Sequence, residues 1–180
     1  MSHPGCPAYP SSVGWFTRHR RERAIALATP TLDGRTWPAD DPAARTGFGA
    51  ATTHRLGLDA AFTPEAHEVA DLLTARLVPL LPIDASPDDL PHVVDVLRSA
   101  AQAGAGLGIV DARSETLGPD RIGAEVAGAL GEAERDLPPM PAELRRQARF
   151  LMHAGHHVAR LGPDVLPALE AEITGSATAG

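Results

Sequence analysis

The sequence contains no lysine, and all sixteen of its basic residues are arginine. With the many Ala, Gly and Pro residues, this indicates a gene from a GC-rich bacterium. Only 4% of the residues are aromatic, so a core must be built from Leu, Val, Ile and Ala, which suits closely packed helices. The single cysteine, Cys6, excludes a disulfide within the chain, and nothing indicates an oxidising compartment.

The sequence also lacks a long uninterrupted apolar run. Its most apolar regions, 69–81 and 93–110, are each interrupted by an aspartate and an arginine. The first residues do not show the basic, apolar and small-residue order of a signal peptide. We therefore expect a cytoplasmic protein without a membrane span of about 20 residues.

The net charge of −7 is distributed unevenly along the chain. Residues 1–60 have a balance of +2, whereas residues 61–180 have a balance of −9. An acidic body repels nucleic acid and anionic membrane surfaces. The arginine-rich residues 17–24 follow Trp15 and Phe16, a combination that can bind nucleic acid, so an arginine-armed nucleic-acid-binding regulator remains a disfavoured alternative.

Five segments after residue 60 place a proline just before acidic residues and an apolar run. Proline fits the first helical position, and acidic residues complement the positive end of the helix dipole. The sequence therefore predicts a mainly α fold, a bundle of four to five antiparallel helices over residues 61–174. The expected helices span about 64–81 (with a kink or end at Pro79), 87–103, 119–135, 141–161 and 163–174.

Residues 1–60 differ from the rest of the chain. They are rich in Pro, Gly and other turn residues but contain five of the seven aromatic residues. We expect a largely irregular segment that docks on the bundle or on a partner, with a small hairpin as an option around Asp33 and Gly34. Residues 175–180 are expected to form a flexible tail.

The glycine-rich stretch AGAGLGIVDARSE, residues 103–115, has some likeness to phosphate-binding loops. A dinucleotide fingerprint needs a strand before the glycines and a helix after them, and here a predicted helix precedes them. We interpret the stretch as a helix end near Ala103, closed by Gly104, followed by extended or loop chain.

Three histidines lie close together in FLMHAGHHVARLG, residues 150–162. On a helical wheel, Leu151 and Val158 belong to the apolar stripe, whereas His153, His156 and His157 fall on the other side. The pattern therefore predicts that the histidines form a polar surface that faces solvent or an interface.

A divalent metal site is the alternative interpretation of the histidine cluster. His153 and His157 are four residues apart, the spacing at which a helix offers two imidazoles to one metal. A third ligand would come from His67 or His92 on another helix. No glutamate lies between the histidines as in the H-E-x-x-H zinc pattern, and neighbouring arginines oppose a cation.

The segment HAGHHVARL resembles the late helix of DinB-like thiol-transferase bundles, in which an H-x-x-H-H segment supplies two metal ligands and an earlier helix the third. This resemblance implies His153 and His157 as ligands of a divalent metal. It implies His67 or His92 as the partner ligand, in a metal-dependent transferase.

Residues 120–169 are similar to an uncharacterised family of small helical proteins from GC-rich bacteria associated with natural-product biosynthesis as accessory proteins. The matching motif is His157-Val158, Leu161 and Pro163-Asp164-Val165. This resemblance implies no mechanism.

No complete catalytic constellation is visible in the sequence, so whether the protein is an enzyme stays open. Our leading hypothesis is a small cytoplasmic helical binding or accessory protein that binds a protein partner or self-associates. The alternatives are the metal-dependent bundle enzyme with its histidine triad and the nucleic-acid-binding regulator.

Overall fold

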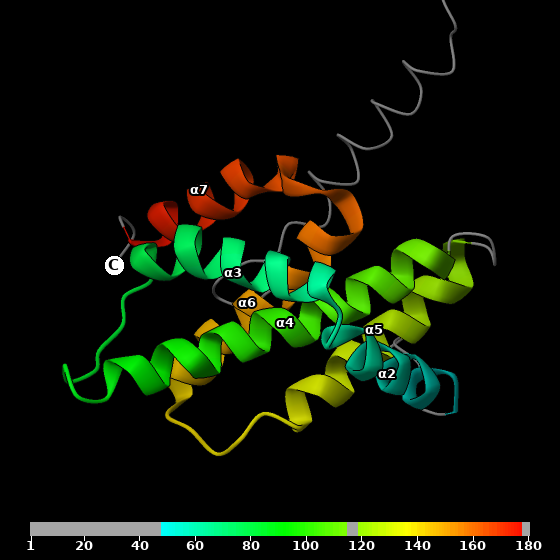
Figure 1. The fold of residues 1–180 in the computed structure, drawn as a ribbon, viewed down its shortest axis with the longest axis horizontal. Helices are drawn as coiled ribbons and strands as arrows, with labels where there is room; N and C mark the ends of the chain where they lie inside the picture. Colours follow the sequence, from blue (N-terminus) through cyan, green and yellow to red (C-terminus); the bar gives the residue numbers. More distant parts are fainter. Residues whose placement is uncertain (1–47, 115–118, 178–180) are drawn as a thin grey trace, which may run out of the picture.

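A computed structural model describes residues 48–114 and 119–177 (Figure 1). Helices account for most of these residues, and no strand occurs among them. The predicted mainly α fold is confirmed. These residues form six α-helices, five of them after residue 61 as expected for the bundle, and one that ends at this residue. The helices are α2 (Phe48–Ala61), α3 (Pro64–Leu77), α4 (Leu90–Ser114), α5 (Pro119–Arg135), α6 (Ala142–Leu161) and α7 (Leu166–Ala177), with short 3-10 helices η2 (Val78–Leu80) and η4 (Pro163–Val165).

Helix α3 begins and ends where its sequence indicates. The hydroxyl of Thr63 accepts a hydrogen bond from the amide of Ala66 at 3.4 Å, and Pro64 occupies the first helical position. At the other end, Pro79 lies in η2, so the α-helix stops at Leu77.

Helix α6 ends at Gly162, as predicted. This glycine has a φ of 90°, a left-handed conformation that residues with a side chain rarely adopt. Its amide donates to the carbonyl of Val158 at 2.8 Å, and Pro163 is the first residue of η4. The predicted last helix is present as η4 and α7 together, although α7 extends into the expected tail as far as Ala177.

The glycine-rich stretch of α4 is a helix-packing surface, so the predicted helix end near Ala103 is wrong. Helix α4 continues to Ser114 and packs along α6. A Cβ atom on Gly104 would overlap the carbonyl oxygen of Met152, and one on Gly108 would overlap that of His156. Glycine is required here because the two backbones approach each other closely, not because the chain turns.

Helix α2 is a correction to the prediction of irregular chain over residues 1–60. It packs against α4 and α5, and Gly57 lies against the side chain of Leu107 on α4. The sequence offered no proline start and no continuous large apolar stripe for α2, because its buried residues are small and Leu56 and Leu58 are exposed. The predicted hairpin and the arginine-rich residues 17–24 lie outside the described residues.

Helix α4 is the one helix in the described part of the chain that is long and apolar enough to cross a membrane by length and composition alone. Half of the relevant window is buried inside the bundle, where α4 packs against α2, α3 and α6. A core helix of a bundle meets the same criteria, and the buried half of α4 accounts for its apolar character.

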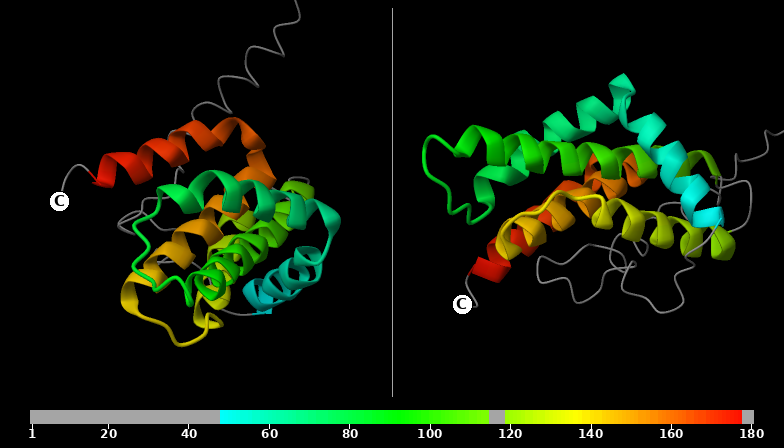
Figure 2. Two further views of the ribbon diagram at one scale, coloured as in Figure 1. Left: turned by 60° about the vertical axis from the view of Figure 1, so that its left-hand side comes forward. Right: turned by 90° about the horizontal axis from the view of Figure 1, so that it is seen from below.

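Helix α6 packs chiefly along α4 and also contacts α3. Figure 1 shows α3 and α4 in front of α6, with α7 above α3. Gln147 connects α6 to the link between α3 and α4, because its side-chain amide donates to the carbonyl of Pro82 at 2.9 Å. Figure 2 shows this link at the same end of the molecule as the start of α6. Residues of α6 on every face of the helix are buried, from Gln147 to Val158.

Candidate functional site

The three histidines of α6 are buried, contrary to the predicted polar surface. His153 is 1% exposed, and His156 and His157 are each 5% exposed. The prediction placed them correctly opposite the apolar stripe but assumed that this side faces solvent. The polar side of α6 is buried as well, and carboxylates from α5 and α4 contact the imidazoles of His153 and His156.

His153 is hydrogen-bonded to Glu134, from the last turn of α5. Its Nε2 atom lies 3.0 Å from Oε1 of Glu134, and Nε of Arg149 lies 2.7 Å from Oε2 of the same carboxylate. Burial lowers the pKa of His153 below its usual value of 6.5, although the hydrogen bond with Glu134 and its charge oppose this shift. Glu134 therefore joins α5 to α6 through two basic side chains.

His156 pairs with Asp111 of α4. Its Nε2 atom lies 2.9 Å from Oδ2 of Asp111, Nε of Arg160 lies 3.1 Å from the same oxygen, and Nδ1 of His156 lies 3.2 Å from Nδ1 of His157. Burial raises the pKa of Asp111, but the hydrogen bond with His156 and the charges of His156, Arg160 and His157 together lower it below 3.8. These contacts satisfy a buried carboxylate and join α4 to α6.

The predicted metal ligands are not gathered at one point. Within residues 48–114 and 119–177, no group of three or more His, Cys, Asp or Glu side chains is arranged to hold a metal ion. His153 pairs with Glu134, whereas His67 contacts Arg98 on the surface of α3 and α4, with 3.5 Å between its Nδ1 and Nη2 of Arg98. The structure therefore adds no geometric support to the predicted divalent-metal site.

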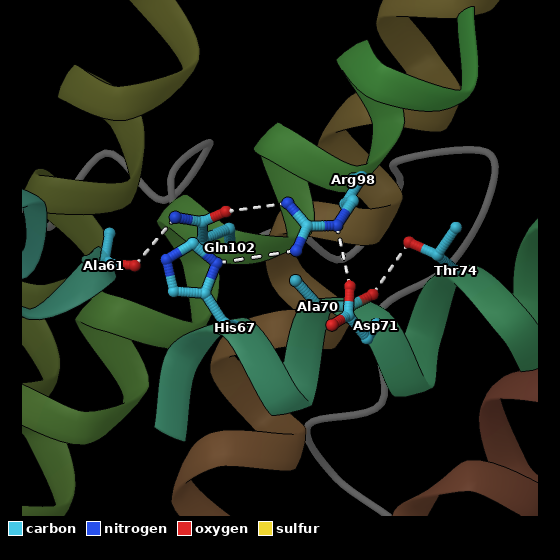
Figure 3. A network of polar contacts seen from close by, with 7 residues as sticks. All are labelled: Ala61, His67, Ala70, Asp71, Thr74, Arg98 and Gln102. Atoms are coloured by element: carbon cyan, nitrogen blue, oxygen red, sulfur yellow. Dashed lines mark hydrogen bonds and ion pairs between the residues drawn. The ribbon is translucent and has the colours of Figure 1, made fainter. Parts of the chain in front are cut away.

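The surroundings of His67 have a structural role (Figure 3). Arg98 of α4 forms an ion pair with Asp71 of α3, with 2.7 Å between Nε and Oδ1. The side-chain amide of Gln102 donates to the carbonyl of Ala61, at the end of α2, at 2.8 Å. Arg98 and Gln102 also contact each other, so this network holds α2 and α3 against α4.

A pocket of about 400 Å³ lies between α2, α4, the end of α5 and α6. The fourth of the predicted ligands, His92, lines it together with His54 of α2. The full lining consists of His54, Leu58, His92, Asp95, Val96, Ser99, Ala100, Ala103, Ala133, Asp136, Leu137, Pro138 and Met152.

Helix α4 provides one long wall of this pocket. Its lining residues recur at intervals of three and four, which places them on one helical face. Along this face, His92, Asp95 and Ser99 are exposed at the rim, whereas Ala100 is buried below them. Met152 of α6 is also buried, so the floor of the pocket is apolar.

His54 and Asp136 form a polar pair on the opposite side. Nε2 of His54 lies 3.3 Å from Oδ2 of Asp136, which is 65% exposed. The Nε2 atom of His54 is buried, and it makes no hydrogen bond of good geometry with any described residue. The pocket therefore combines an apolar floor with two histidines, two aspartates and a serine near its rim.

Sequence reasoning identified His92 but not the pocket. The other lining residues come from α2, α4, α6 and the end of α5 with the chain that follows it, and α2 was not predicted at all. The only local signal was the spacing of His92, Asp95 and Ser99 on a helix, which is also typical of an ordinary exposed helical face.

No protein-family model, curated protein or solved structure matches the chain. The two family resemblances therefore remain predictions.

Proposed function

We propose that the protein is a small helical binding protein whose pocket receives a small, largely apolar molecule. The observation that carries this proposal is the pocket of about 400 Å³ between α2, α4, the end of α5 and α6. Ligand sites in proteins typically have volumes of about 300–1,000 Å³, mostly apolar walls and a few polar groups that orient the ligand. The floor around Ala100 and Met152 and the rim with Ser99 and His92 fit this description.

A pocket with an apolar floor and a polar rim is sufficient for a binding role and requires no catalytic residues. It is consistent with the binding or accessory role expected from the sequence, and with the resemblance of residues 120–169 to natural-product accessory proteins. Association with a protein partner or with a second copy remains a separate prediction from the sequence.

The proposal can be tested with the methyl group of Met152, which lines the pocket. The chain has only three methionines, so selective ¹³C-methyl labelling gives a simple NMR spectrum. We expect the neutral probe 2-naphthylmethanol to shift the Met152 methyl signal in a saturable way. Ala103→Phe fills the pocket and should weaken binding by about tenfold or more, equivalent to about 1.4 kcal/mol.

The matched control is Ala112→Phe, an exposed position on the same helix outside the pocket lining. It should bind the probe like the unmodified protein. The proposal is wrong if no saturable shift occurs, or if Ala103→Phe binds the probe as well as Ala112→Phe does.

A further inference from the structure

We infer that the pocket selects an apolar molecule that carries a protonated amine. This inference rests on the proposed binding function and adds the chemical class of the ligand. Two carboxylates, those of Asp95 and Asp136, are among the described residues that line the pocket. If histidine is counted as neutral, these residues include no other charged side chain. None of the chain's sixteen arginines is among these lining residues.

The arginine nearest to Asp95 in the sequence is engaged elsewhere. Arg98 follows Asp95 by three residues on α4, a spacing at which opposite charges can pair on a helix. Its guanidinium group instead contacts Asp71 on α3, with 2.7 Å between Nε and Oδ1 (Figure 3). Asp95 makes no ion pair with any residue in the described part of the chain, so its charge is available to a ligand.

At Asp136, too, the arginine nearest in the sequence pairs with another carboxylate. The adjacent Arg135 pairs with Glu132, with 2.5 Å between Nη2 and Oε1. The partner of Asp136 is His54, at 3.3 Å, and this contact lacks hydrogen-bond geometry. A carboxylate has about four lone-pair sites, so Asp136 retains acceptors for a further donor.

An organic ammonium fits this pocket better than a bare metal ion. Its N–H groups can donate hydrogen bonds to the carboxylate of Asp95 or of Asp136 at the rim, and its apolar body can cover the floor. A calcium ion instead requires about six to eight oxygen ligands and gains nothing from an apolar floor. The acidic body of the chain, with a balance of −9 over residues 61–180, also attracts a cation at long range.

Three probes share a naphthalene ring and differ in the charge of their polar group. They are the cation 2-naphthylmethylamine, the neutral 2-naphthylmethanol and the anion 2-naphthoate. We expect the amine to bind at least about fivefold more tightly than the alcohol and the carboxylate to bind more weakly than both, read from the Met152 methyl signal. The preference for the amine should decrease as the salt concentration rises. The double variant Asp95→Asn, Asp136→Asn should bind the amine and the alcohol about equally.

Both substitutions are nearly isosteric and lie at exposed positions, so the variant should fold normally. The control is Asp84→Asn, which removes an exposed charge in the link between α3 and α4, outside the pocket lining. It should leave the preference intact. If the alcohol or the carboxylate binds as tightly as the amine, or if the preference survives in the double variant, the amine specificity is wrong while the binding function stands. If none of the three probes binds, the binding function itself is wrong.

Discussion

Gly104 of α4 and Met152 of α6 meet backbone to backbone, because a Cβ atom on the glycine would overlap the carbonyl oxygen of the methionine. Gly155 of α6 is placed in the same way against the carbonyl of Ala101 on α4. The two longest helices therefore approach each other through small residues on both sides, and larger side chains there would separate them.

We expect Gly104→Ala to destabilise the protein by about 3 kcal/mol, because the added methyl group meets backbone that can move only if the helices separate. Gly175→Ala is the matched control, since its Cβ would meet nothing within 4 Å. The control should stabilise α7 by about 0.5–1 kcal/mol through its better helix propensity. Urea denaturation measures both changes, and effects of the same sign would contradict the close approach of α4 and α6.

Asp111→Ala should destabilise the protein by about 3–5 kcal/mol, because it removes the carboxylate that His156 and Arg160 share in a buried position. The control is Arg113→Ala, which breaks a pair with Glu65 in which both side chains are largely exposed and 3.7 Å apart. This change should cost less than about 1 kcal/mol. Equal losses in urea denaturation would show that the pair with His156 contributes no more than a surface contact.

The lowered pKa of His153 predicts a loss of stability as the pH falls. Below the usual value of 6.5 the unfolded chain takes up a proton at this residue, whereas the folded chain does not until a lower pH. The free energy of unfolding should therefore decrease as the pH is lowered from about 7.5 to about 5.5. Burial is the main cause of the lowered pKa of His153, while Glu134 raises this pKa and the nearby His156 and Arg149 lower it further.

His153→Gln removes the titrating group and retains an amide that can donate to Glu134. Its free energy of unfolding should change less between these two pH values than that of the unmodified protein. Identical pH profiles would assign the acid sensitivity to other groups. Asp111 acts in a separate window, because its lowered pKa gives stability that is present above pH 3.8 and lost as the pH falls through its folded-state value.

Gln102→Ala should cost about 1 kcal/mol, because the carbonyl of Ala61 loses its side-chain donor (Figure 3). Since α2 provides one wall of the pocket, this variant should also weaken binding of 2-naphthylmethanol. The control, Thr174→Ala, removes an exposed hydroxyl that bonds only to carbonyls of its own helix. This control should change the free energy of unfolding by less than about 0.5 kcal/mol and leave binding of 2-naphthylmethanol unchanged. Equal stability and equal binding in the two variants would contradict the role of Gln102.

The positions of several helices could be predicted from local chemistry. Proline at the first helical position and a cap such as Thr63 act within one turn, so the start of α3 was visible without the rest of the fold. Gly162 and Pro163 likewise ended α6 by backbone conformation alone. These signals need no information about which helices become neighbours.

The neighbours themselves could not be predicted from the sequence. Gly104 is typical of a helix end in isolation, and only the backbone of Met152 explains why it lies within a helix. In the sequence alone, His153 and His156 have the spacing of a solvent-exposed helical face. Their contacts with Glu134 and Asp111 come from other helices and are visible only in the structure. The pocket depends on the same kind of information, because its walls come together only when α2, α4, α5 and α6 pack against one another.

The burial of α6 on all sides has a consequence for how the protein opens. The amide hydrogens between Gln147 and Val158 can exchange with solvent only when this helix is uncovered, which requires several of its neighbours to separate together. Exchange there should follow the free energy of global unfolding, whereas the exposed end of α7 should exchange through local fraying. Among the described helices, the slowest-exchanging amides are therefore expected in α6 beside its buried histidines.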